Sequence, residues 1–266
     1  LTHSAYKHFH FYNLKLTAGE RISRIENFAP ELGLALKSKS KPIFSTLSEQ
    51  GLIRLQTTHG DAEEISLHEM LVEYLPPANM FFPFLLGETE EGLPYWMDMV
   101  DNPHLLVAGA SGSGKSVLLH NLIGNALYRN DVEIFLSDCK QVEFNAYKDL
   151  GNIQLATTYQ ETVKMLEYVF KMMNGRYDIL KNLKITSIEQ KPKLFTKIIV
   201  ILDEIGDLIL SDKSKDLQNF LIRLAQKARA AGIYLVMATQ RPSVNIISGL
   251  IKANFPARIC CKVSSR

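Results

Sequence analysis

The sequence has few cysteines, and none lies in a pattern that indicates a metal site or a disulfide framework. Only three occur in 266 residues: Cys139, Cys260 and Cys261. They show no CxxC spacing and have no accompanying histidines at the spacing of a zinc site. We therefore expect three reduced, buried thiols in a cytoplasmic protein.

Long apolar runs are missing as well. No stretch approaches the ~18–20 apolar residues that cross a bilayer. Lysine and histidine side chains interrupt the first ten residues, which argues against a signal peptide. The chain starts at Leu1 rather than at a methionine, and we expect both of its ends to be cut from a longer protein. A membrane anchor, if the parent protein has one, would then lie in a segment outside this chain.

An excess of charge of either sign is also absent. The 30 lysines and arginines nearly balance the 28 aspartates and glutamates, for a formal net charge of +2. Bulk electrostatics therefore does not indicate a nucleic-acid-binding protein, although basic residues can be concentrated on one small surface. The hydrophobic fraction of 46% and the charged fraction of 22% are typical of a soluble globular protein.

The pattern along the chain predicts two domains. A small α+β domain covers residues 1–77, and a larger α/β domain covers residues 78–266 and is truncated at its C-terminus. The proline-rich stretch from Pro76 to Asn79 marks the linker. The elements predicted for the first domain are strands at 9–16 and 51–56, a helix over 20–36 that Pro30 interrupts, and a short helix after Ser66, which with Glu69 forms a possible capping box.

The second domain alternates apolar strands with amphipathic helices. It opens with a candidate hairpin formed by 82–86 and 94–99. Strands are then predicted at 104–108, 132–137, 198–202, 233–238 and 257–261, and helices at 115–128, 160–181 and 216–230. This alternation predicts a mostly parallel sheet that is covered by helices.

A glycine-rich stretch of the form GxxxxGK[ST] follows the first of these strands. Its residues are Gly109, Ala110, Ser111, Gly112, Ser113, Gly114, Lys115 and Ser116. A strand before it and a helix after it provide the context that a phosphate-binding loop requires. Lys115 would reach the β- and γ-phosphates, and Ser116 would bind Mg²⁺. The stretch therefore predicts a site for ATP and Mg²⁺, with a chance Gly/Ser-rich turn as the alternative.

Two acids follow the apolar strand at 198–202. Asp203 and Glu204 come directly after it, at the edge of the sheet where open α/β sheets bind their ligands. Asp203 is placed to hold Mg²⁺, and Glu204 is placed to polarise the attacking water. A solvated acid at the end of a buried strand is the simpler alternative, but the phosphate-binding loop favours the catalytic interpretation.

Two further strands end in polar residues. Thr239 and Gln240 follow the strand at 233–238, and either could sense the γ-phosphate from between the two motifs. Asp138 follows the strand at 132–137 and would lie at the same edge; structural positioning and functional contact are both open for it. Near the end of the helix at 216–230, Arg229 either stabilises the helix C-terminus or acts as an arginine finger on a neighbouring subunit.

Together, these residues resemble the FtsK/SpoIIIE family. The resemblance covers the approach to the phosphate-binding loop from His104 and the Asp203-Glu204 pair. Its most specific part lies in the stretches 223–232, 238–244, 249–254 and 263–265. It is strong over residues 103–266 and weaker over 1–100, which are similar to the family's small α domain and to the entry hairpin of its β motor domain.

The resemblance implies a RecA-like P-loop ATPase core that acts as a homo-hexameric ring. Double-stranded DNA would thread through the pore, and the family's role would be chromosome segregation during cell division. Arg229 would be the arginine finger in trans, and Arg241 matches the arginine of a loop that faces DNA. Lys213 and Lys215 fall where a second pore loop would lie, although such residues more often form a solvated basic loop.

The sequence also departs from the family pattern. The segment between Tyr177 and Ile198 is short, Cys139 replaces the usual proline of Asp-Pro-Lys, and Ile205-Gly206 replaces the common Phe-Ala. These departures leave two alternatives open. One is a DNA-transfer ATPase of a mobile or conjugative element, and the other is a protein-export ATPase of the type VII secretion kind.

Overall fold

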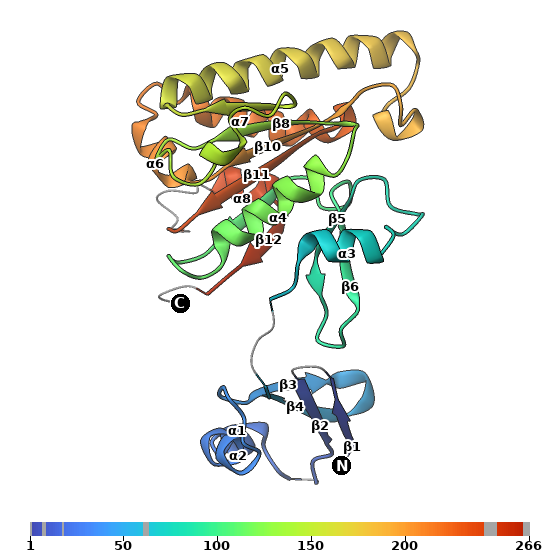
Figure 1. Cartoon of the computed structure of the whole chain (residues 1–266), viewed down its shortest axis with the longest axis vertical. Helices are drawn as coiled ribbons and strands as arrows, with labels where there is room; N and C mark the ends of the chain where they lie inside the picture. The colour runs from blue at the N-terminus through green and yellow to red at the C-terminus, as the bar shows by residue number, and fades with distance from the viewer. Residues whose placement is uncertain (1, 7–8, 18, 61–63, 242–248, 263–266) are drawn as a thin grey trace. The chain divides into compact units, whose positions relative to one another are not determined.

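The computed structural model describes residues 2–6, 9–17, 19–60, 64–241 and 249–262 (Figure 1). The chain divides into two compact units. The first comprises Leu1–Tyr74 with Gly87–Tyr95, and the second comprises Leu75–Leu86 with Trp96–Arg266. Each is described by itself below. None of the helices in the described ranges is long and apolar enough to cross a membrane.

The first unit contains an antiparallel four-stranded sheet of order β1-β2-β4-β3. Its strands are β1 (Thr2–Ala5), β2 (Phe9–Leu14), β3 (Ile43–Leu47) and β4 (Leu52–Thr58). Side chains along β4 alternate, so that Ile53, Leu55 and Thr57 are buried on one face. The short strands β1 and β3 were not predicted, because neither shows a clear alternation of apolar and polar residues.

The helix predicted over 20–36 is two helices, α1 (Ile22–Glu26) and α2 (Ala29–Ala35). Pro30 lies in the first turn of α2, where its missing N–H group costs nothing and its fixed φ suits the start of a helix. The capping box before α3 (Leu67–Glu73) is half confirmed: the Glu69 backbone N–H donates to the Ser66 hydroxyl over 3.4 Å.

The second unit is built on a six-stranded parallel sheet of order β12-β7-β11-β10-β8-β9 (Figure 1). Its strands are β7 (Leu105–Ala108), β8 (Val132–Ser137), β9 (Ile153–Ala156), β10 (Lys197–Leu202), β11 (Ile233–Thr239) and β12 (Ala257–Cys260). All five predicted strands are confirmed. The edge strand β9 was not predicted, because half of its four residues are solvent-accessible and it lacks a long apolar run.

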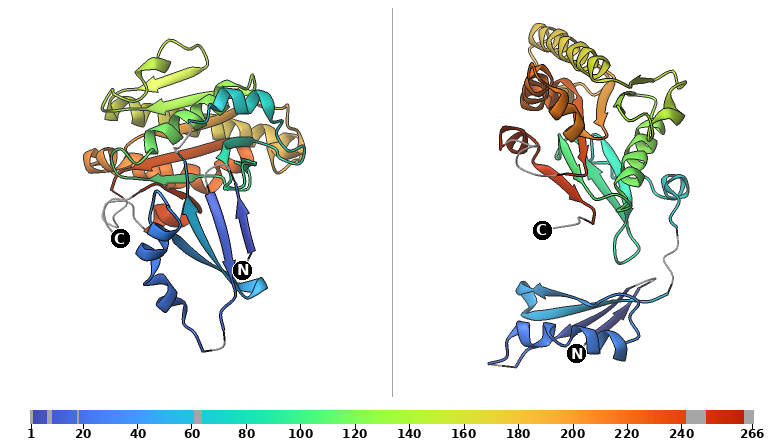
Figure 2. Two further views of the ribbon diagram at one scale, coloured as in Figure 1. Left: turned by 60° about the horizontal axis from the view of Figure 1, so that its bottom comes forward. Right: turned by 90° about the vertical axis from the view of Figure 1, so that its left-hand side faces the viewer.

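Helices cover both faces of this sheet (Figures 1 and 2). They are α4 (Lys115–Leu127), α5 (Tyr159–Asn182), α6 (Ile205–Ser211), α7 (Asp216–Lys227) and α8 (Gly249–Asn254). Residues of β10 divide between two cores: Val200 packs with α5 and α7, and Ile201 packs with α4. Burial on both faces explains why β10 is a continuous apolar run.

A hairpin of β5 (Pro83–Glu88) and β6 (Pro94–Asp98) adds to the core on the α4 side. The Asn125 side chain of α4 ties β5 to the core of the second unit: it accepts from the Leu85 N–H over 2.7 Å and donates to the Leu85 carbonyl over 3.0 Å. β5 is therefore anchored at Leu85 to the helix that begins with Lys115.

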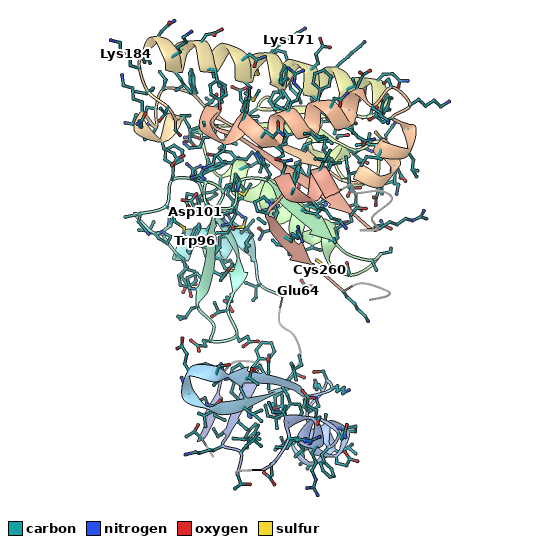
Figure 3. The ribbon with its side chains drawn as sticks, turned by 180° about the vertical axis from the view of Figure 1, so that it is seen from behind. Glu64, Trp96, Asp101, Lys171, Lys184 and Cys260 are labelled. Carbon is teal, nitrogen blue, oxygen red and sulfur yellow. The ribbon has the colours of Figure 1, made fainter. Side chains whose placement is uncertain are left out.

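The longest helix, α5, is amphipathic. Thr158 caps its first turn by accepting from the Glu161 N–H, and Leu166, Val169 and Met173 bury one face against the sheet. Its outer side is charged: Lys171 lies there in an i,i+4 ion pair with Glu167 (Figure 3).

The cysteines are free, as predicted, but the prediction that they are buried is wrong. Cys139 and Cys260 are exposed, and Cys261 is half-buried. All three come at or just after the ends of strands, where the chain leaves the core (Figure 3 labels Cys260). The helix predicted over 216–230 also ends early, because a 3₁₀ turn (Ala228–Ala231) and Gly232 at φ 72° close it.

The buried His104 makes the stability of the second unit depend on pH. Its ring is 2% exposed and accepts a hydrogen bond from the Leu235 N–H at Nδ1 over 3.2 Å. Burial lowers the pKa of His104 from 6.5 to about 4. Between these values the unfolded chain binds the proton and the folded chain does not, so acidification favours unfolding.

We expect the free energy of unfolding to fall by about 3 kcal/mol between neutral pH and pH 4 through this group. Denaturant titrations across that range measure the effect. His104→Asn keeps an acceptor for the Leu235 N–H but removes the titrating group. Between neutral pH and pH 4, its free energy of unfolding should therefore fall by about 3 kcal/mol less than that of the parent protein. Equal pH slopes for the parent and the variant would contradict the assignment.

Candidate nucleotide-binding site

The glycine-rich loop lies between β7 and α4, at the carboxyl edge of the sheet. Gly112 and Gly114 have φ values of 72° and 93°, which residues with a Cβ rarely adopt. A Cβ on Gly109 would lie 2.9 Å from the Cβ of Cys261. The Ser113 hydroxyl is buried without a partner among the described residues. The loop is thus a backbone cradle with an unused polar group, as a phosphate site requires.

Lys115 and Asp203 lie together at the end of this loop, 88 positions apart in sequence. The Lys115 ammonium forms a buried ion pair with the Asp203 carboxylate and lies 3.4 Å from the Asp203 carbonyl oxygen. Burial raises the pKa of Asp203, and the positive charge of Lys115 opposes that rise. A buried cation and a buried acid therefore neutralise each other where phosphate and metal would bind.

Ser116 is held by a residue that the sequence did not single out, Glu143. The Ser116 hydroxyl donates to the Glu143 carboxylate over 2.8 Å. That bond uses the hydroxyl proton and leaves the oxygen lone pairs of Ser116 free for a metal ion. The only signal for Glu143 in the sequence is that it is an acid a few positions after β8, the strand next to β10.

Asp138 sets the position of Glu143. Its carboxylate is 1% exposed and accepts from the backbone N–H groups of Glu143 and Phe144 over 2.8 and 2.9 Å. Of the two roles left open for Asp138, this geometry supports structural positioning. Its second oxygen is buried and has no partner among the described residues, so it also adds negative charge to the site.

Glu204 is tied to the end of β11, which lies between β7 and β10 in the sheet. The Thr239 hydroxyl and the Gly206 N–H donate to one carboxylate oxygen over 2.8 and 3.2 Å. The Gln240 N–H donates to the other oxygen over 2.9 Å. Strand order therefore brings Glu204 and Thr239 together between the two motifs, next to the phosphate-binding loop.

The residues predicted to face DNA lie at the same edge of the sheet. Arg241 is exposed, directly after β11 and Gln240. Lys213 and Lys215 are exposed in the turn between α6 and α7. The buried Asp212 builds that turn: it caps α7 and accepts from the Tyr159 hydroxyl, at the start of α5, over 2.7 Å. The remaining loop residues predicted after Arg241, and the final stretch 263–265, lie outside the described residues.

Arg229 lies at the opposite edge. It belongs to the turn that leads into the amino end of β11, its side chain is 48% exposed, and its Nε lies 3.7 Å from Glu189. The phosphate-binding loop directly follows Ala108, which pairs with Thr239 at the carboxyl end of β11. Arg229 precedes the amino end of the same strand. Seven strand residues correspond to roughly 20 Å. Arg229 thus cannot reach the phosphate-binding loop of its own chain.

The residues at the site fit Mg²⁺. The described residues contain no group of three or more His, Cys, Asp or Glu side chains arranged to hold a metal ion by themselves. Mg²⁺ in nucleotide sites does not need such a group, because it binds one or two protein oxygens together with phosphates. The Ser116 hydroxyl and the Asp203 carboxylate supply that donor set.

Comparison with known proteins agrees with this geometry. The sequence model of the FtsK/SpoIIIE family matches residues 73–197 and 191–244. The chain belongs to the FtsK/SpoIIIE family. A DNA translocase FtsK of Streptococcus pneumoniae is 36% identical over 96% of the chain. The chain spans 36% of the length of that FtsK/SpoIIIE protein.

Solved structures share the fold at lower identity. The pCW3 conjugation coupling protein TcpA, solved as a monomer with ATPγS, matches with a TM-score of 0.67 and 23% identity, over 100% of this chain and 77% of that one. The cytoplasmic domain of the Thermomonospora curvata type VII secretion ATPase EccC matches with a TM-score of 0.61 and 20% identity, over 76% of this chain and 26% of that one. The α/β P-loop fold predicted from the sequence is confirmed.

Proposed function

We propose that this FtsK/SpoIIIE member is the motor of a ring-shaped ATPase that moves double-stranded DNA during chromosome segregation. One observation carries the proposal: Lys115, Asp203 and Glu204 meet at the carboxyl edge of the sheet, beside a loop whose backbone can hold phosphates. The family membership and the DNA translocase FtsK relatives support DNA as the substrate.

ATP binds with its phosphates against the N–H groups of the glycine-rich loop. Lys115 leaves its ion pair with Asp203 and neutralises the β- and γ-phosphates, which frees the Asp203 carboxylate. Ser116 and Asp203 hold Mg²⁺, which when bound offsets phosphate charge. Glu204 orients the attacking water and accepts its proton.

A neighbouring subunit completes the site. Arg229 is exposed at the edge of the sheet away from its own phosphate-binding loop, and its charge serves the nucleotide of the next subunit in the ring. A head-to-tail arrangement of this kind closes into a ring, for which a homo-hexamer is the proposed number of subunits. The parent protein's attachment to a membrane would use a segment outside this chain.

Arg241, Lys213 and Lys215 contact the phosphate backbone of DNA in the pore. All three are exposed at the carboxyl edge, on turns that are anchored by Thr239 and Asp212. Contacts to phosphates carry no sequence information and release counterions, so DNA binding is independent of sequence and weakens with salt.

We expect linear duplex DNA to raise the ATPase rate of the protein severalfold or more, and rising salt to reduce that stimulation. Hydrolysis rates with and without duplex, alongside the measured oligomeric state, test this. Preference for single strands would favour the DNA-transfer alternative. Stimulation by an exported protein but not by duplex DNA would favour the type VII secretion alternative and overturn the proposal.

A further inference from the structure

The Glu204 carboxylate is held by a short relay of hydrogen bonds that starts at Arg241. The Arg241 backbone N–H donates to the Thr239 hydroxyl oxygen over 3.0 Å. The Thr239 hydroxyl in turn donates its single proton to Glu204 over 2.8 Å. The relay thus joins Arg241, which is proposed to contact DNA, with the residue proposed to orient water.

Thr239 has no alternative partner in water. It is fully buried, and a buried hydroxyl that loses its protein partners is left unsatisfied. The branched Cβ of Thr239 restricts its side-chain rotamer, and its hydroxyl has a single proton to donate. A shift of the Arg241 backbone would therefore change the bond that Thr239 gives to Glu204, and not only the local turn.

The bonds from β11 also limit what Glu204 can do. A carboxylate has about four lone-pair positions, and Thr239, Gly206 and Gln240 together occupy three in this structure. Two of the three come from the end of β11. Glu204 is thus oriented towards β11, with one position left for water.

We propose that Thr239 is a positioning residue that holds Glu204 back until DNA engages Arg241. Engagement moves the Arg241 backbone, weakens the bond from Thr239 to Glu204 and lets the carboxylate turn to the attacking water. The inference rests on the proposed function and adds to it how hydrolysis is coupled to DNA.

The test uses Thr239→Val, which keeps the shape of the side chain and removes the hydroxyl. We expect its DNA-free hydrolysis rate to rise by roughly tenfold, the low end of the effect of removing one hydrogen bond to a charged group. The ratio of the rate with duplex DNA to the rate without it should fall by a similar factor. Nucleotide affinity should stay within about twofold, because the Thr239 hydroxyl is engaged by Glu204 and the Arg241 N–H, while the glycine-rich loop and Lys115 are proposed to hold the phosphates.

Two control variants separate the relay from a general packing effect. Thr239→Ser keeps the hydroxyl and should keep most of the DNA stimulation. Thr162→Val removes a fully buried hydroxyl of α5, which bonds Ser137 of β8 and the Thr158 carbonyl and not Glu204. It should change the thermal unfolding midpoint but not the stimulation ratio.

The possible outcomes distinguish the two proposals. If the parent protein is stimulated by duplex DNA and Thr239→Val has the parent's stimulation ratio, the relay is overturned and the proposed function stands. Loss of hydrolysis with and without DNA in both Thr239 variants, at an unchanged unfolding midpoint, would also overturn it. A parent protein that duplex DNA does not stimulate fails the proposed function itself.

Discussion

Lys115→Ala should abolish ATP hydrolysis, both with and without duplex DNA, lowering the rate by at least about a hundredfold. The ammonium of Lys115 is the buried positive charge that the structure places at the phosphate-binding loop. Without it, the charge that develops on the transferred phosphoryl group has no cis cation from the protein. Steady-state kinetics measure the loss of hydrolysis, and a fluorescent ATP analogue measures whether nucleotide binding changes with it.

Stability has to be followed in this variant. Removing Lys115 leaves Asp203 buried without its cation, and breaking one half of a buried pair commonly costs about 3–5 kcal/mol. Uptake of a proton by Asp203 offsets part of that cost, because burial already raises the pKa of its carboxyl group. Lys171→Ala, on the outer side of α5, is the matched lysine control and should hydrolyse ATP at the parent rate (Figure 3). A folded Lys115→Ala protein with the parent rate would disprove the site.

Arg229→Ala should lower the hydrolysis rate by about 10³-fold, the lower end of the effect of an arginine finger, while nucleotide binding persists. The reason is its position: Arg229 is half exposed and lies at the sheet edge opposite the phosphate-binding loop of its own chain. In the proposed ring, its charge serves the nucleotide of a neighbouring subunit. Arg223→Ala is the matched control, because Arg223 stacks on Phe170 over 4.4 Å within the same chain.

Mixing two inactive variants tests the trans role directly. Lys115→Ala protein still carries Arg229, and Arg229→Ala protein still carries Lys115. In a ring of both, about a quarter of the interfaces combine an intact Lys115 with an intact Arg229 from the neighbour. Hydrolysis should therefore recover in the mixture and not in either variant alone. A mixture as inactive as its components, with ring formation verified, would contradict a finger in trans.

The strands of the second unit could be read from the sequence because they are apolar runs bounded by turn residues. β10 (Lys197–Leu202) is buried on both faces and so is apolar at every position after Lys197. The glycine-rich loop could be read because its backbone conformation demands glycine at Gly112 and Gly114. Signals of this kind are local: a few neighbouring residues carry them completely.

Short elements were missed where packing and not local pattern decides the structure. β9 (Ile153–Ala156) has four residues and forms by pairing with β8. α6 (Ile205–Ser211) is capped by Glu204, whose side chain accepts from the Gly206 N–H. The exposed cysteines were misjudged for a related reason, since an apolar residue type at a strand end does not reveal whether the core covers it.

The sequence by itself determined the parallel α/β core, the phosphate-binding loop from Gly109 to Ser116 and the acids Asp203 and Glu204, because each is encoded within one short segment. Only the tertiary structure decided which side chains meet. The order β7-β11-β10-β8 places Thr239 against Glu204 and the loop after β8, with Glu143, against Ser116. Strand order depends on how the whole sheet packs, and no local pattern in the chain records it.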